Sequence, residues 1–96
     1  MFARVARWEG ADPEALRRSA AEIASRAASG PPEGVPGTAF TLLVDPEGGR
    51  AMAIVLFATE EDRATGHETL NAMSPPESMG TRSAVEFYEV AVQETT

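Results

Sequence analysis

The residues of this sequence that could do chemistry are few, and its single histidine is the first of them. His67 lies in a segment with helical periodicity, three residues after Ala64 and three before Leu70, near the edge of an apolar stripe. An imidazole there could face a pocket and act as a general base or as a haem ligand. The alternative is a partly exposed ring that packs against a sheet. The sequence favours this alternative, because we identify no other residue that would orient the imidazole.

Glu86 and Tyr88 form a second candidate site near the end of the chain. They are two residues apart in a valine-rich and aromatic-rich run, so in a strand both side chains lie on one face, while Glu89 lies on the other. Beside a cleft, Glu86 and Tyr88 could bind a phenolic substrate or accept a proton. The favoured alternative is an ion pair between one of the glutamates and an arginine near the N-terminus, Arg4 or Arg7.

Two large aromatic residues are candidates for lining a pocket, together with Glu86. Trp8 ends the first apolar run and Phe57 lies near the end of the third. A flat ring can stack on an aromatic ligand, but a tryptophan can equally cover the core or anchor an interface. The second interpretation is favoured for Trp8, because tryptophan usually packs against other residues.

Composition argues against several classes of site. The 96 residues include no cysteine, so thiolate nucleophiles and disulfides are excluded, and one histidine leaves only carboxylates as further zinc ligands. There is no lysine for a phosphate-binding GxxxxGK loop and no GxSxG serine elbow. The net charge of −7, spread along the chain, opposes binding to nucleic acid. We therefore expect no metal, no cofactor and no nucleic-acid partner.

Local signals divide the chain into six elements. Asp12 and Pro13 are typical of a helix start, and Thr59 is a second cap, followed by Glu60 to Asp62, which supply the negative charge that a first turn favours. These acids are therefore assigned to the helix start and not to acid/base catalysis. The expected elements are strands at Phe2–Trp8, Thr38–Val44, Arg50–Ala58 and Ser83–Val92, a helix of about four turns from Asp12, and a helix from Thr59 to Met73.

The order of these elements, βαββαβ, predicts one ferredoxin-like α+β domain over residues 1–96, with a four-stranded antiparallel sheet and two helices on one face. However, the run Ala51–Ala58 is apolar at every position, and Ala39–Val44 is nearly so. Such strands are typical of a sheet that is covered on both faces. Two helices cover only one face, so we expect an identical copy to cover the other in a homodimer.

The chain shows no sign of a membrane segment. Its start lacks a basic region followed by a long apolar run, and no stretch approaches the roughly 20 apolar residues that span a bilayer. All eight basic residues are arginine, and alanine is abundant, which is typical of a GC-rich bacterial genome. We therefore expect a bacterial, cytoplasmic protein without a membrane partner.

Several segments together resemble the antibiotic biosynthesis monooxygenase-like family of dimeric α/β-barrel proteins. The resemblance extends over nearly the whole chain and is carried by turn and strand patterns, namely Val35-Pro36-Gly37, Leu42–Asp45, the apolar run into Thr59–Asp62, and Val85–Val90. It implies a homodimer with a cavity between sheet and helices in each subunit. Some members oxygenate aromatic phenols without a cofactor, and others degrade haem.

The sequence departs from that family at two places. Phe57 stands where the family often has tryptophan, and the first strand lacks the asparagine of the haem-degrading branch. Haem chemistry is therefore disfavoured. Two functions remain open at this point: a cofactor-independent monooxygenase-like enzyme that acts on a small aromatic substrate, and a non-catalytic module for ligand binding or interaction. His67 and Tyr88 are the candidate catalytic residues of the first.

Overall fold

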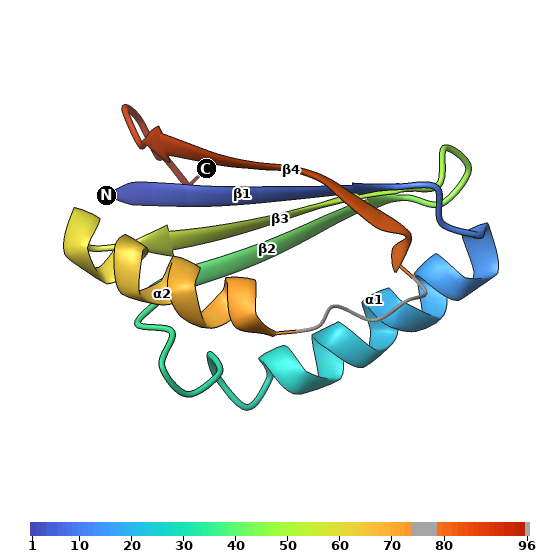
Figure 1. Ribbon diagram of the computed structural model, residues 1–96, viewed down its shortest axis with the longest axis horizontal. Coiled ribbons are helices and arrows are strands. Elements are labelled where there is room, and N and C mark those ends of the chain that lie inside the picture. Colours follow the sequence, from blue (N-terminus) through green and yellow to red (C-terminus); the bar gives the residue numbers. More distant parts are fainter. Residues whose placement is uncertain (74–78, 96) are drawn as a thin grey trace.

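The fold is known from a computed structural model, which describes residues 1–73 and 79–95. It confirms a ferredoxin-like α+β arrangement in which both helices lie on the same side of an antiparallel sheet (Figure 1). The elements in chain order are β1 (Phe2–Glu9), α1 (Pro13–Ala27), β2 (Ala39–Asp45), β3 (Arg50–Phe57), α2 (Glu60–Ala72) and β4 (Thr81–Glu89).

Both helices begin at the caps that the sequence predicts. The backbone N–H of Ala15 donates to Asp12 Oδ2 at 3.1 Å, and that of Asp62 donates to Thr59 Oγ1 at 3.0 Å. Each cap satisfies an amide that has no partner within its helix. In the described part of the chain, neither helix combines the length and the hydropathy that a bilayer crossing requires.

The strand order is β2-β3-β1-β4, so β1 and β3 are the central strands and every neighbouring pair is antiparallel. Because side chains alternate along a strand, this register divides the sheet into two faces. The helix-covered face carries Arg4, Ala6, Trp8, Ala51, Val55, Phe57, Val85 and Phe87. The open face carries Val5, Arg7, Leu43, Met52, Ile54, Leu56, Glu86 and Tyr88.

The core under the helices has two parts. In the first, Leu16 of α1 is fully buried and packs against Trp8 and Ala6 of the sheet. In the second, Phe57 is fully buried with Val55 beneath α2. The helix approaches Phe57 closely at Gly66, where a Cβ atom would lie 2.5 Å from Cε1 of the ring. The second part of the core therefore needs a residue without a side chain at this turn of α2.

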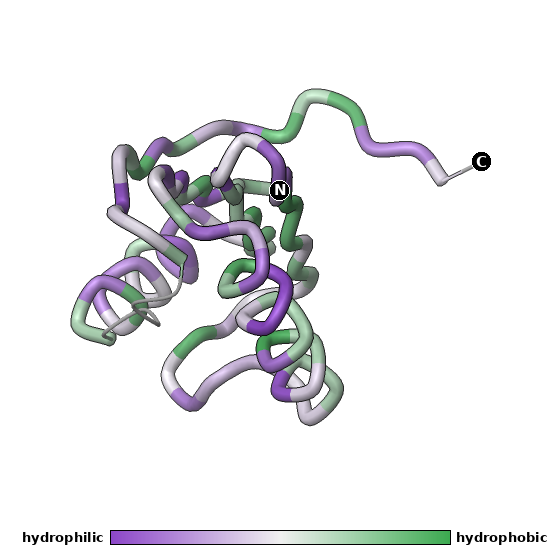
Figure 2. Tube along the Cα trace, turned by 90° about the vertical axis from the view of Figure 1, so that its right-hand side faces the viewer, coloured by the Kyte–Doolittle hydropathy of each residue, from purple (hydrophilic) through white to green (hydrophobic). Residues whose placement is uncertain are grey.

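The last strand differs from its prediction at both ends. It begins at Thr81, two residues before the expected Ser83, and ends at Glu89 rather than Val92. Beyond it, Val90 N–H donates to the carbonyl of Met1 at 2.9 Å, and the chain then runs away from the body (Figure 2). Val92 is 79% exposed because no strand lies beside it. The prolines and glycine of Ser74–Gly80 predict a segment that breaks the second helix, and residues 74–78 of it lie outside the described residues.

We expect Gly66→Ala to destabilise the fold. The added methyl group would overlap the Phe57 ring, and overpacking of this kind costs about 1–3 kcal/mol, from which a gain in helix propensity of about 1 kcal/mol is subtracted. The expected net loss is up to about 2 kcal/mol in urea unfolding at a fixed protein concentration. Thr65→Ala, on the exposed side of the same turn, is the control. Equal stability of the two variants would contradict the packing account.

Candidate functional site

The most unusual contact in the structure joins the centre of the sheet to α2. Arg4 of β1 is only 5% exposed, and its Nε donates a hydrogen bond to His67 Nδ1 at 3.0 Å. The two residues are 63 positions apart in the sequence. Arg4 therefore supplies the orientation of the imidazole for which the sequence offered no partner.

The hydrogen bond from Arg4 determines the protonation state of His67. A guanidinium can only donate, so Nδ1 must be unprotonated and the neutral ring carries its proton on Nε2. Burial lowers the pKa of His67, and the charges of Arg4 and Arg82 lower it further, while Glu68 acts in the opposite direction. The imidazole is therefore neutral at neutral pH and presents an N–H donor at Nε2.

Aromatic rings flank this pair on the helix-covered face. The rings of His67 and Phe87 meet edge to face, with centroids 4.9 Å apart, and Phe87 is 47% exposed. The guanidinium of Arg63 lies over Phe2 at 5.2 Å and over Phe87 at 5.3 Å from the ring centroids. Arg63 also donates to the carbonyl of Tyr88 at 2.9 Å and lies 3.7 Å from Glu60, so its charge is partly balanced.

A third cationic residue reaches this region through an irregularity in β4. Arg7 pairs with Ala84, but Trp8 pairs with Arg82, so Ser83 is skipped in the register. Such a bulge moves the following side chains to the opposite face of the sheet. Arg82 consequently lies on the helix-covered face, where its Nη2 donates to Asn71 Oδ1 of α2 at 2.8 Å.

Arg4, His67 and Arg82, here named the arginine–histidine cluster, have no neutralising carboxylate among the described residues. Within residues 1–73 and 79–95, no ion pair includes Arg4 or Arg82. Burial and the charge of Arg82 lower the pKa of Arg4. Arginine keeps its proton even so, and a buried guanidinium without a counter-charge is costly. The cluster therefore consists of hydrogen-bond donors with excess positive charge.

Glu86 and Tyr88 lie on the open face, on the other side of the sheet from His67. Arg7 Nε pairs with Glu86 Oε1 at 2.5 Å, which is one of the predicted ion pairs, and Tyr88 Oη donates to Glu86 Oε2 at 3.0 Å. These hydrogen bonds hold the pKa of Glu86 below its ordinary value and raise that of Arg7. The structure therefore does not bring the two candidate catalytic residues, His67 and Tyr88, into one site.

The two aromatic pocket candidates are packed in the core. Phe57 is fully buried beneath α2, and Trp8 is buried against Leu16, Ala51 and Met79. Within the described residues, Trp8 Nε1 is buried without a hydrogen-bond partner, which is unfavourable for an N–H group. Trp8 and Phe57 belong to separate parts of the core, so they do not line one aromatic pocket with Glu86.

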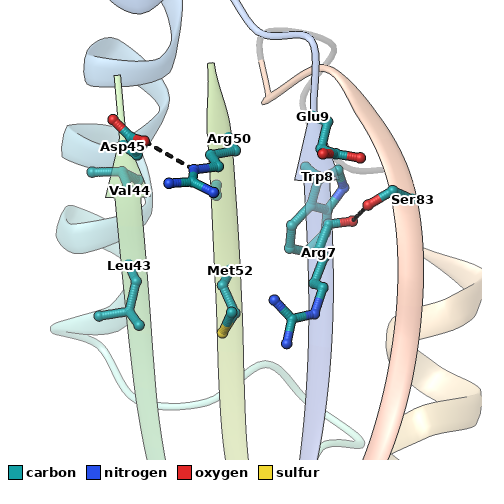
Figure 3. A pocket seen from close by; sticks show the side chains of 10 residues that line it. Arg7, Trp8, Glu9, Leu43, Val44, Asp45, Arg50, Met52 and Ser83 are labelled. Atoms are coloured by element: carbon teal, nitrogen blue, oxygen red, sulfur yellow. Dashed lines mark hydrogen bonds and ion pairs between the residues drawn. The ribbon is translucent and has the colours of Figure 1, made fainter. Parts of the chain in front are cut away.

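Neither of two open hollows on the described structure includes His67. One, of about 430 Å³, lies towards the end of the open face, where Figure 3 shows Leu43, Met52 and Arg7 on neighbouring strands. The Asp45–Arg50 ion pair, at 2.9 Å, lies at its rim. The other, of about 370 Å³, lies between α1 and β2, and its lining is entirely apolar: Ala20, Ile23, Ala24, Ala27, Phe40, Leu42 and Val44.

Chemically, the arginine–histidine cluster is suited to holding a negative charge. It supplies guanidinium and imidazole donors but no carboxylate that could accept a proton or bind a cation. Across the described residues, no group of three potential metal ligands comes together. Sequence reasoning named Arg4 only as a possible ion-pair partner of Glu86 or Glu89, and it did not identify Arg82. The signal for Arg4 was its spacing of two and four residues from Ala6 and Trp8, which places it on the buried face.

Comparison of the sequence with protein families and with curated proteins identifies no relative. No protein-family model matches the chain, and no curated protein matches it. The resemblance to antibiotic biosynthesis monooxygenase-like proteins therefore stays a prediction, and function is argued from the site itself.

We expect the Arg7–Glu86–Tyr88 network to make stability depend on acid pH. Because the folded pKa of Glu86 is lowered from 4.5, its stabilising contribution is complete above that value and is lost as the pH falls through the folded pKa. Between pH 7 and about pH 3, unfolding measurements should therefore show a larger loss of stability for the wild type than for Glu86→Gln. Glu33→Gln, in an exposed loop, should lose as much as the wild type. Parallel curves for all three proteins would contradict the assignment.

Proposed function

We propose that this protein is a homodimeric, non-catalytic binding domain, in which two open faces pack together and each subunit keeps its own ligand site under α2. The observation that carries the proposal is the apolar open face. Val5, Met52, Ile54 and Leu56 form its centre on β1 and β3, and no helix covers them. Leu43 on the neighbouring strand is 50% exposed. A second copy offers the same apolar surface in return.

The size of the open face suits a modest dimer interface. Four strands spaced about 4.8 Å apart, each about eight residues long, span on the order of 19 by 26 Å, or roughly 500 Å² in projection. Accessible area exceeds projected area because side chains stand out from the sheet. The lower limit for stable complexes is about 600 Å² on each partner. Burial of this area would therefore give a dimer in the usual range.

The polar groups of the open face are compatible with being covered. Arg7, Glu86 and Tyr88 satisfy one another through the two hydrogen bonds described above. A charge that is already paired loses less on burial than an isolated one. Covering this network would also protect it from solvent, which strengthens its hydrogen bonds.

The site geometry favours binding over catalysis. A general base needs a free lone pair, but the Nδ1 lone pair of His67 accepts a hydrogen bond from Arg4 Nε–H, and Nε2 carries a proton. Tyr88 lies on the opposite face and donates to Glu86. Neither His67 nor Tyr88, the candidate catalytic residues of the oxygenase hypothesis, is therefore placed to deprotonate a phenol. The bacterial and cytoplasmic setting belongs to the same proposal and rests on composition alone.

We expect sedimentation and light scattering at micromolar concentration to give a mass of twice the 10.2 kDa of one chain. Leu43→Glu, which places a charge on the open face, should give monomers, because like charges would meet across the interface or be buried there. Val92→Glu makes the same change on the exposed tail and should leave the dimer intact. A wild-type monomer, or a Leu43→Glu dimer as tight as the Val92→Glu dimer, would refute the proposal.

We also expect no catalysed oxygen consumption when the protein is mixed with a panel of quinols and anthrones. The measurement is oxygen uptake above the rate in buffer. His67→Gln is the matched variant, since it removes the imidazole and keeps a hydrogen-bonding side chain of similar length. A wild-type rate well above background that this variant abolishes would establish an enzyme instead of a binding domain.

A further inference from the structure

We propose that the arginine–histidine cluster is a binding site for a small organic carboxylate, held between Arg4, His67 and Arg82 with its apolar body against Phe87. This inference rests on the binding role proposed above and names the ligand class. It does not depend on the dimer, because the cluster lies on the helix-covered face of a single subunit. Its test can therefore fail while the dimer stands.

The first step is the unbalanced charge of Arg4. Its Nε donates to His67, and no carboxylate lies within ion-pair distance of the guanidinium in the described part of the chain. The residue is nevertheless 95% buried, since its exposed fraction is 5%. Buried guanidinium groups are ordinarily paired with an anion. A bound anion would supply the missing partner.

The second step is the convergence of donors from three elements. Arg4 of β1 donates to His67 of α2, and Arg82 of β4 donates to Asn71, which lies one helical turn after His67. The guanidinium fork of an arginine matches the two oxygens of a carboxylate, and the imidazole of His67 adjoins the guanidinium of Arg4. Glu68 is the acid that acts on His67 from its own helix, and it is exposed at the surface. The positive groups therefore outnumber the negative one.

The third step distinguishes a carboxylate from a phosphate. Phosphate sites commonly use the free backbone N–H groups at a helix N-terminus. His67 lies in the second half of α2, so its neighbours on the helix have their amides in the helical hydrogen-bond ladder. With side-chain donors alone and Glu68 nearby, the site suits one negative charge better than two.

The fourth step concerns the rest of the ligand. Phe87 meets the His67 ring edge to face and remains 47% exposed, so an apolar surface adjoins the donors. A carboxylate with an aromatic or aliphatic body could cover this ring, and burial of apolar area contributes about 25 cal/mol per Å². A carboxylate without such a body would lose this contribution.

The test follows the imidazole of His67, which is the only histidine in the chain, by NMR. The probes are benzoate, acetate and inorganic phosphate, each added at constant ionic strength with chloride as the reference anion. Benzoate should shift the imidazole resonances with saturation and raise the pKa of His67, because a negative charge beside the ring stabilises its protonated form. Acetate should bind several-fold more weakly, and phosphate should bind more weakly than benzoate.

Two arginine variants make the result specific to the cluster. Arg82→Gln should weaken benzoate binding by about tenfold or more, the usual effect of losing one charged hydrogen bond. Arg18→Gln removes the same charge from the exposed side of α1 and should leave affinity unchanged. Both positions are exposed, so both variants are expected to fold, and unfolding curves check this. No saturable response to benzoate, equal loss in both variants, or tighter binding of phosphate would overturn the inference, whatever the state of the dimer.

Discussion

The hydrogen bond between Arg4 and His67 constrains much of what this small domain can do. Arg4 carries a permanent positive charge on a central strand beneath α2, and water reaches only a small part of its side chain. The imidazole accepts from the guanidinium, so it cannot neutralise it. This contact sets the tautomer of His67, and burial of the ring, followed by the charges of Arg4 and Arg82, lowers its pKa.

The alternation of side chains along β1 gives the two faces of the sheet different electrostatic character. Arg7, three residues after Arg4, lies on the open face and is matched by Glu86. That face therefore combines apolar residues with a neutral, satisfied network, which suits contact with another protein surface. The helix-covered face combines a buried apolar core with the guanidinium groups of Arg4 and Arg82, which form no ion pair among the described residues. Assembly and ligand binding can consequently use opposite faces of one sheet without competing for the same residues.

The sequence predicted what depends on local rules and missed what depends on register. The caps at Asp12 and Thr59 were predicted because a cap needs only residues three positions apart. Arg82 was missed because regular alternation from Phe87 places it on the open face, and the skipped Ser83 reverses this. The contact of Arg4 with His67 was missed because it depends on how α2 lies across β1, which periodicity does not specify. His67 and Tyr88 were candidates for one catalytic site because no local rule predicts that a helix residue and a strand residue lie on opposite sides of the sheet.

The overall acidity of the chain and its local excess of positive charge act on different length scales. A net charge of −7 repels a large polyanion over its whole surface. A small carboxylate in the arginine–histidine cluster would interact with its guanidinium groups at short range, whereas surface charges more than about 8–10 Å away are screened by salt. The same protein can therefore exclude nucleic acid and still favour a small anion. Size, as well as charge, then selects the ligand.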